Sequence, residues 1–171
     1  TLNPLKQMGP LSIFLTFVIG LAFGAVPVNP SRMRHRYSPA LVAFAGPFVN
    51  LVLFLIFCLG LVIVTIKSGS MSEDVFTGAR DLFTMGATLN VVLFAFNMLP
   101  IPMLDGFEVL AYFVPTIHRV DQKVKNIVFF VMVIVIFASS RFIFMAGAVA
   151  TYVTASGMMF VINFLHLGKL F

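Results

Sequence analysis

An uncharged run of 27 residues, Ala40 to Ile66, most constrains what this chain can fold into. A helix of about 20 apolar residues spans the hydrocarbon core of a bilayer, so this run predicts a transmembrane helix. Only 10% of the 171 residues are charged and 60% are hydrophobic, whereas soluble domains contain about 25% charged residues. We therefore expect an integral membrane protein with an all-α fold, a polytopic bundle of transmembrane helices.

Four to five membrane segments are expected within a single transmembrane domain that covers residues 1–171. The hydrophobic segments lie at about 8–26, 40–66, 82–103, 126–142 and 143–167. The first contains proline and glycine, which also permits a re-entrant segment. The last two are either two spans joined by a tight turn, or one span and a segment that lies on the membrane. We favour two spans.

The charges of the loops predict an orientation. The 27–39 loop contains three arginines, and the 115–125 loop contains three basic residues and one acidic residue. The intervening 67–81 loop contains two basic and three acidic residues. Cytoplasmic loops are enriched in Lys and Arg, so we expect loops 27–39 and 115–125 to be cytoplasmic. We assign the net charge of +5 to this orientation, and no nucleic-acid partner is expected.

The apolar run that ends at Leu99 is followed by Pro100-Ile101-Pro102-Met103-Leu104-Asp105-Gly106. Two prolines this close together stop a helix, because proline lacks an N–H and pushes the preceding residue out of the α region. In a membrane, irregular backbone and a charge are tolerated where they line a protein cavity or a wet site. Asp105 could therefore bind a metal, relay protons or bind a coupling ion. It could also stabilise a turn, since Asp-Gly is a common turn pair.

A second irregular point, Ala45-Gly46-Pro47-Phe48-Val49-Asn50, lies within the longest apolar run. Gly-Pro inside a span predicts a kink and a close helix contact. Asn50, one turn later, could hydrogen-bond a backbone group that the kink leaves free. Helix packing alone would also account for this stretch.

The sequence offers at most one good zinc ligand. Zinc sites need three or four ligands from His, Cys, Asp or Glu. His35, His118 and His166 are not paired at i, i+4, and Cys58 fits a small core or lipid-facing residue. Ser156 and His166 come nearest to a catalytic dyad, but nine residues separate them on one predicted segment. The chain alone could not build a hydrolytic zinc site.

Three stretches, in this order, resemble the site-2 protease family of intramembrane zinc metalloproteases, in particular its compact bacterial branch without an inserted PDZ domain. They are Thr1-Leu-Asn-Pro-Leu-Lys6 with Pro10 and Val26-Pro-Val-Asn-Pro30; Gly46-Pro47-x-x-Asn50; and Asn97-x-x-Pro100-x-Pro102-x-Leu104-Asp105-Gly106. The resemblance covers approximately residues 1–115.

The resemblance implies that Asp105 is the third zinc ligand. Substrate-positioning or structural roles would fall to Asn97, Pro100, Pro102, Gly106, Gly46, Pro47 and Asn50. The cofactor would be zinc, which activates a water molecule for peptide-bond hydrolysis. The partners would be the lipid bilayer and a transmembrane-helix protein substrate, cleaved in regulated intramembrane proteolysis. The expected location is the bacterial inner membrane.

The main departure from the family is that the sequence contains no His-Glu-x-x-His, the motif that supplies two ligands and the general base. That motif normally precedes Leu-Asn-Pro-Leu, so we expect an N-terminally truncated protease that is inactive as this chain alone. The alternative is a catalytically inactive relative that acts as a scaffold or subunit of a membrane complex. A transporter that uses Asp105 and Glu108 as an ion site would predict internal repeats, and none of useful length is present.

Overall fold

The computed structural model describes residues 35, 37–102 and 104–165, except for the side chain of His118. Thr1–His35 and Arg36–Phe171 form two compact units, and the second is described here. The predicted segment 8–26, most of the 27–39 loop and the Leu-Asn-Pro-Leu stretch lie outside the described residues. Those described contain five α-helices, two short 3-10 helices and no strand, which confirms the all-α prediction.

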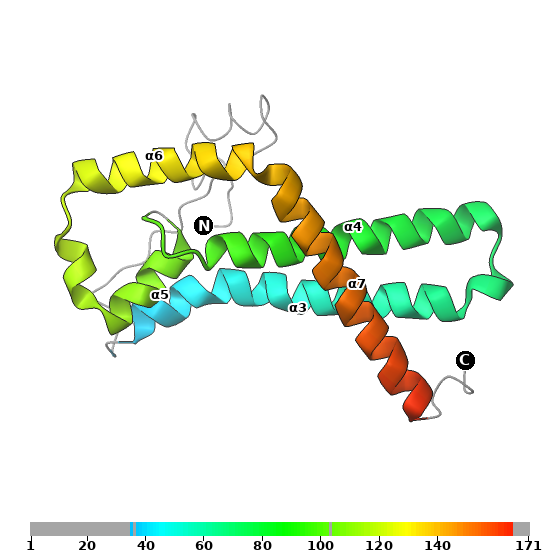
Figure 1. Ribbon diagram of the computed structural model, residues 1–171. Coiled ribbons are helices and arrows are strands. Elements are labelled where there is room, and N and C mark those ends of the chain that lie inside the picture. Colours follow the sequence, from blue (N-terminus) through cyan, green and yellow to red (C-terminus); the bar gives the residue numbers. More distant parts are fainter. Residues whose placement is uncertain (1–34, 36, 103, 166–171) are drawn as a thin grey trace, which may run out of the picture. The chain divides into compact units, whose positions relative to one another are not determined.

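The helices form a hairpin that is crossed by a third long helix. Figure 1 shows α3 and α4 side by side, α7 crossing both of them, and α5 beside the first turns of α3. α6 leads from the α5 end of the hairpin to the start of α7. The bounds are α3 Ser38–Ile66, η2 Ser68–Ser70, α4 Glu73–Asn97, α5 Asp105–Phe113, η3 Pro115–Arg119, α6 Gln122–Ala138 and α7 Ser140–Phe164.

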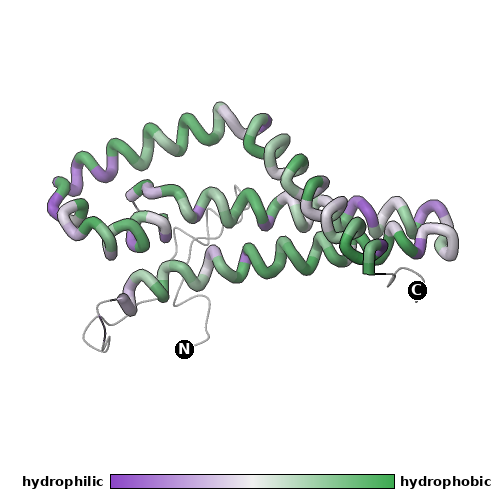
Figure 2. Tube along the Cα trace, turned by 60° about the horizontal axis from the view of Figure 1, so that its bottom comes forward, coloured by the Kyte–Doolittle hydropathy of each residue, from purple (hydrophilic) through white to green (hydrophobic). Residues whose placement is uncertain are grey.

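Three helices, α3, α4 and α7, are long and apolar enough to cross a membrane. α6 has 17 residues, so at about 1.5 Å per residue it is roughly 26 Å long, shorter than the hydrocarbon core. Figure 2 shows hydrophilic residues gathered at the α3–α4 turn and around the start of α6, with mainly hydrophobic helix between. The described residues therefore form a helical membrane bundle.

The prediction of a loop over residues 67–81 is wrong after Ser72. α4 begins at Glu73 and so includes the polar residues before the apolar run. Ser72 has extended backbone (φ −66°, ψ 152°), and Glu73 and Asp74 occupy the first turn. Acidic residues there interact favourably with the positive end of the helix dipole. Hydropathy marks the part of a helix that lies in lipid, whereas these local features set where the helix starts.

Two predicted helix interruptions are confirmed. The predicted irregular point at Gly46-Pro47, in contrast, lies within a continuous helix. The chain leaves α4 after Asn97 and resumes at Asp105 in α5, and Ser139 separates α6 from α7. By contrast, α3 is helical without a break from Ser38 to Ile66, with Pro47 inside it.

Glycines and phenylalanines interlock α3 with α4. A Cβ on Gly86 of α4 would lie 2.5 Å from the ring of Phe57, and one on Gly60 of α3 would collide with the ring of Phe83. The two rings meet edge to face, with their centroids 6.1 Å apart. Each ring thus fills the space left by a missing side chain on the opposite helix, which brings the helices close together.

α7 packs on the hairpin through small and hydroxyl-bearing residues. A Cβ on Gly147 would lie 2.7 Å from Val92 Cγ2 of α4. One turn later the buried hydroxyls of Thr88 and Thr151 lie 3.3 Å apart, within hydrogen-bond distance. Thr151 also donates to the carbonyl oxygen of Gly147 at 3.0 Å. Phe54, Cys58 and Ala87 form the buried apolar cluster beside this crossing.

Candidate functional site

The backbone between α4 and α5 folds into two successive tight turns, each with a proline at its centre. Ile101 N–H donates to Leu99 C=O at 2.8 Å around Pro100, and Leu104 N–H donates to Ile101 C=O at 3.0 Å around Pro102. Proline suits both places, because its fixed φ matches the centre of a three-residue turn and the second position of a four-residue turn. Ile101 and Pro102 are buried and Pro100 is exposed. These two turns directly precede Asp105.

Asp105 is the first residue of α5, directly after Leu104 in extended conformation. Gly106 follows and is buried against the end of α4. A Cβ on Gly106 would lie 2.6 Å from the carbonyl oxygen of Leu99 and would also collide with the backbone carbonyl of Met98. Both obstacles are main-chain atoms, which cannot rotate away as a side chain can. Gly106 is therefore needed for the close approach of α5 to the end of α4, which fixes the place of Asp105.

The carboxylate of Asp105 points at α3. Its Oδ2 lies 3.4 Å from the point where a Cβ on Gly46 would be. Pro47, the next residue of α3, is fully buried. The structure thus brings together two predicted site stretches that are far apart in the sequence, Gly46-Pro47 and Asp105-Gly106.

Among the described residues, no basic side chain compensates the charge of the Asp105 carboxylate. The residue lies outside the three candidate spans and is partly buried. Burial removes water from the carboxylate and raises its pKa above the ordinary value for aspartate. Desolvation is the cause of this change, and no basic side chain of the described residues counteracts it. A desolvated carboxylate without a basic partner can be stabilised by a bound cation.

The other predicted site residues differ in their burial and in the helix on which they lie. Asn97 is the last residue of α4 and is half-buried. Asn50 is half-buried one turn after Gly46, but its amide takes part in no side-chain hydrogen bond within the described residues. The predicted bond of Asn50 to a freed backbone group is therefore not seen. Glu108, the alternative ion ligand, lies in the first turn of α5 and is exposed.

One contact near the site could not be predicted from a motif. The ammonium group of Lys125, in the first turn of α6, lies 5.5 Å from the centre of the Phe107 ring in α5. This cation–π contact joins the first turn of α6, which begins within the predicted 115–125 loop, to the short helix that begins with Asp105. A basic residue and an aromatic residue 18 positions apart give no local signal of such a contact.

The described residues do not complete a zinc site. Among them, no group of three His, Cys, Asp or Glu side chains is close enough to hold a metal ion. His35 is exposed, the side chain of His118 is not described, and His166 lies outside the described residues. Asp105 has the oxygen donor that zinc accepts, but the remaining ligands would have to come from elsewhere.

Comparison with known proteins gives a consistent assignment. Residues 59–139 match the sequence profile "Peptidase family M50", a range that includes Asn97 and Asp105. The chain is 33% identical over 141 residues to "Putative zinc metalloprotease YwhC" of Bacillus subtilis (strain 168), covering 81% of this chain and 64% of that protein.

A second relative is archaeal. The chain is 33% identical over 107 residues to "Putative zinc metalloprotease MJ0611" of Methanocaldococcus jannaschii, covering 58% of this chain and 51% of that protein. The chain therefore spans less than two thirds of the length of either relative. No solved structure matches it. In the profile match and in these two relatives, the chain is similar to peptidase family M50, the site-2 protease family.

Proposed function

We propose that the complete protein is an intramembrane zinc metalloprotease, and that this chain supplies Asp105 as one of the zinc ligands. The observation that carries the proposal is the Asp105 carboxylate, which is desolvated, lacks a basic partner among the described residues and lies over Gly46. The similarity to peptidase family M50 and to a protein named as a putative zinc metalloprotease supports the choice of zinc over another cation. Zinc, when bound, would supply Lewis-acid activation of a water molecule for peptide hydrolysis.

In this proposal the residues around Asp105 hold its carboxylate in one position. Gly106 lets α5 approach the backbone of Met98 and Leu99, and Gly46 leaves room beside the carboxylate. A ligand held by packing on two helices loses little freedom when it binds a metal. Asn97, at the end of α4 and half-buried, is the proposed positioning residue for the substrate backbone.

The turns before Asp105 suit the binding of an extended peptide. The N–H groups of Ile101 and Leu104 are used within the turns, and Pro100 and Pro102 have none. The described part of this segment can therefore offer carbonyl acceptors to an extended substrate. The proposed substrate is a transmembrane helix, which must unwind locally because a helix uses its own backbone groups internally. Its unwound N–H groups would donate to these acceptors.

The proposed setting is a bacterial inner membrane, with the 27–39 and 115–125 loops on the cytoplasmic side and the Asp105 end facing that side. We also propose that the catalytic motif His-Glu-x-x-His, which this sequence lacks, belongs to another part of the complete protein. On this proposal the 171-residue chain by itself is inactive. The biological role would be regulated intramembrane proteolysis.

Zinc content tests the proposal directly. In the purified complete protein we expect about one zinc per chain, and a zinc affinity lowered at least tenfold by Asp105→Asn. Even the loss of a residue that only hydrogen-bonds to a ligand lowers metal affinity about 10- to 100-fold. Glu108→Gln is the matched control, because it removes a neighbouring exposed carboxylate and should keep the zinc. Unchanged zinc affinity in Asp105→Asn would refute the ligand role. A complete protein that binds no zinc at all would instead support a scaffold or subunit.

A further inference from the structure

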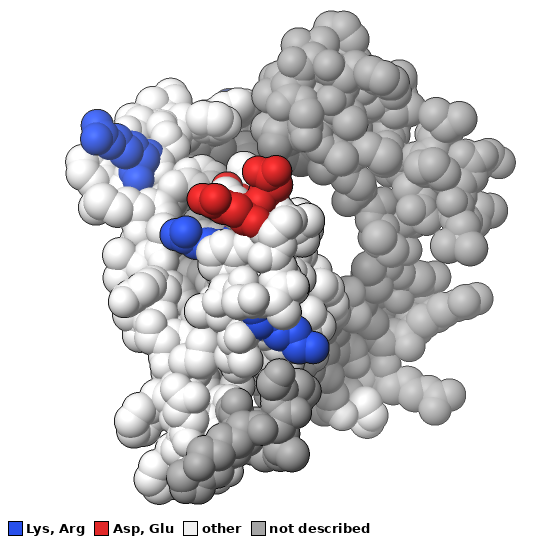
Figure 3. Space-filling model, turned by 90° about the vertical axis from the view of Figure 1, so that its right-hand side faces the viewer, with Lys and Arg blue, Asp and Glu red and all other residues white. Residues whose placement is uncertain are grey.

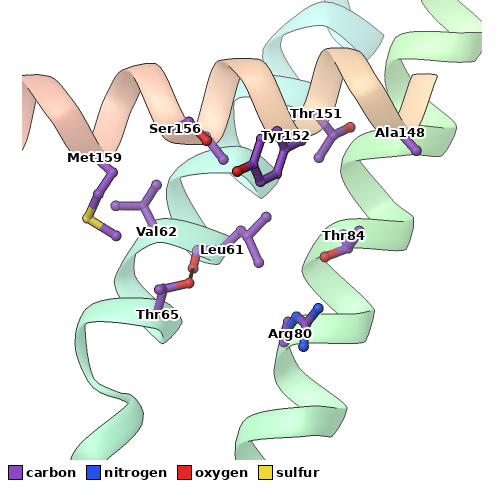
Figure 4. Close-up of a pocket in the computed structure, with 11 residues that line it drawn as sticks. Leu61, Val62, Thr65, Arg80, Thr84, Ala148, Thr151, Tyr152, Ser156 and Met159 are labelled. Carbon is purple, nitrogen blue, oxygen red and sulfur yellow. Dashed lines mark hydrogen bonds between the residues drawn. The ribbon is translucent and has the colours of Figure 1, made fainter. Parts of the chain in front are cut away.

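A pocket of about 440 Å³ lies between the last turns of α3, the first half of α4 and the middle of α7 (Figure 4). Its size is within the range of small-molecule sites, about 300–1,000 Å³. Val62, which lines it, follows Gly46 by 16 residues in α3, so the pocket is roughly 24 Å along the helix from the Asp105 site. It is therefore separate from the proposed catalytic region.

The polar side of the pocket can bind an anion. Its polar lining residues are Thr65, Arg80, Thr84, Thr151, Tyr152 and Ser156. The hydroxyl protons of Thr65 and Thr151 are used by the carbonyl oxygens of Leu61 and Gly147. No hydrogen bond within the described part of the chain uses the Arg80 guanidinium or the hydroxyls of Thr84, Tyr152 and Ser156. One positive charge and three hydroxyl donors therefore face a shared space (Figure 4).

The other side of the pocket is apolar. Its residues come from α3 and α7, and Figure 4 shows Val62 and Met159 on the side away from Arg80. They are Leu61, Val62, Ala148, Ala155 and Met159. A ligand that fills the whole pocket must therefore combine an anionic group with a hydrocarbon portion.

The pocket also lies at the depth where such a ligand occurs in a membrane. It is at the end of the hairpin that carries η2 and the acidic first turn of α4, one of the two hydrophilic ends in Figure 2. Arg80 follows Glu73 by seven residues, about 10 Å along the helix. In Figure 3, which faces this end, basic side chains lie near a small acidic group rather than in a basic patch. An arginine at this level reaches toward the headgroup region.

We propose that this pocket binds a membrane phospholipid, with the phosphate against Arg80 and one acyl chain along Val62 and Met159. Guanidinium–phosphate bonds are charge-assisted and can be bidentate, and Thr84, Tyr152 and Ser156 supply further donors. The lipid would lie in the leaflet at the α3–α4 turn and would join α7 to the hairpin. This proposal does not depend on the protease function.

The test is lipid binding to the whole chain in detergent, measured by native mass spectrometry during titration with dioleoylphosphatidylglycerol. Arg80→Gln should weaken binding at least fivefold, since a hydrogen bond to a charged group is lost. Tyr152→Phe, which removes only one hydroxyl, should weaken it less. Arg141→Gln is the matched control, because Arg141 is exposed near the start of α7 and does not line the pocket. It should bind like the parent chain.

Two further probes distinguish the source of the phosphate. Dioleoylglycerol, which lacks a phosphate, should bind much more weakly than the phospholipid, and inorganic phosphate at millimolar concentration should not displace the lipid. Equal binding of dioleoylglycerol would overturn the proposal in favour of a purely apolar groove. Displacement by inorganic phosphate would overturn it in favour of a free-anion site. Binding unchanged by both Arg80→Gln and Tyr152→Phe would also refute it, and Tyr152→Phe keeps the test valid if Arg80→Gln fails to fold.

Discussion

The Oδ2 atom of Asp105 lies 3.4 Å from the point where a Cβ on Gly46 would be, although the two residues are 59 positions apart in the sequence. This contact joins the start of α5 to α3 at one point. It gives a physical reason for a small residue at position 46 of the longest helix, because a side chain longer than a methyl group would reach into the space of the carboxylate. The first prediction follows from this distance.

Gly46→Ala should keep zinc binding in the complete protein, because a Cβ at 3.4 Å is an ordinary van der Waals neighbour. Gly46→Leu should weaken it by about tenfold or more, since the longer side chain displaces the carboxylate and metal affinity depends on ligand orientation. The measurement is competition with a chromophoric chelator. Gly157→Leu is the control, because nothing lies within 4 Å of a Cβ there. Parent-like affinity in Gly46→Leu would contradict the contact.

Gly106→Ala should destabilise the protein by about 1–3 kcal/mol, the usual cost of overpacking. The new methyl group would meet the backbone carbonyls of Met98 and Leu99, which cannot move without displacing α5. Thermal unfolding in detergent checks this. Gly78→Ala, also inside a helix but in open space, should be neutral or stabilising because alanine favours helix. Equal unfolding temperatures for the two variants would show that α5 is not held at this point.

Gly86→Ala should also destabilise the protein, because the added Cβ would collide with the ring of Phe57. Here the obstacle is a side chain, which a second substitution can remove. Gly86→Ala should therefore cost less stability in a Phe57→Leu background than it costs in the parent chain. A double-mutant cycle measures this coupling, which we expect to be about 1 kcal/mol. Additive effects of the two substitutions would mean that the ring does not occupy the space above Gly86.

Pro102→Ala should reduce proteolysis by the complete protein more than Pro100→Ala does. Pro102 is buried at the second position of a hydrogen-bonded turn, whereas Pro100 is exposed. Both substitutions raise the conformational entropy of the unfolded chain, which lowers stability by about 0.4–1 kcal/mol. Neither shortens an apolar span. Cleavage of a transmembrane substrate in liposomes and membrane insertion should be measured in parallel. Unchanged cleavage in both variants would show that the turns do not position Asp105.

Metal-free Asp105→Asn should be more stable than the metal-free parent chain at neutral pH. Desolvation raises the pKa of Asp105 in the folded state. At a pH above that pKa, ionisation of the carboxyl group therefore lowers the free energy of unfolding. The cost declines as the pH falls and is absent below the pKa in the unfolded state, about 3.9. The gain in unfolding temperature should therefore shrink between pH 7 and pH 4. Asp81→Asn, an exposed residue of α4, is the control for the change in net charge. A gain that grows on acidification would contradict this sign.

Features that depend on a few neighbouring residues could be predicted from the sequence. The break between α4 and α5 follows from two prolines that cannot continue a helix, and the apolar length of α3 follows from its uncharged run. The start of α4 could not be placed, because four of its first nine residues are charged and hydropathy does not report helix outside lipid.

The sequence by itself determined a helical membrane bundle, with motifs that resemble the site-2 proteases and an aspartate directly after a helix break. Only the tertiary structure placed Asp105 over Gly46, Gly106 against the end of α4, and Phe57 over Gly86. It also brought Arg80 beside the hydroxyls of α7. Such contacts depend on the rotation and crossing of helices. Spans that are apolar on every face have no periodicity from which that rotation could be predicted.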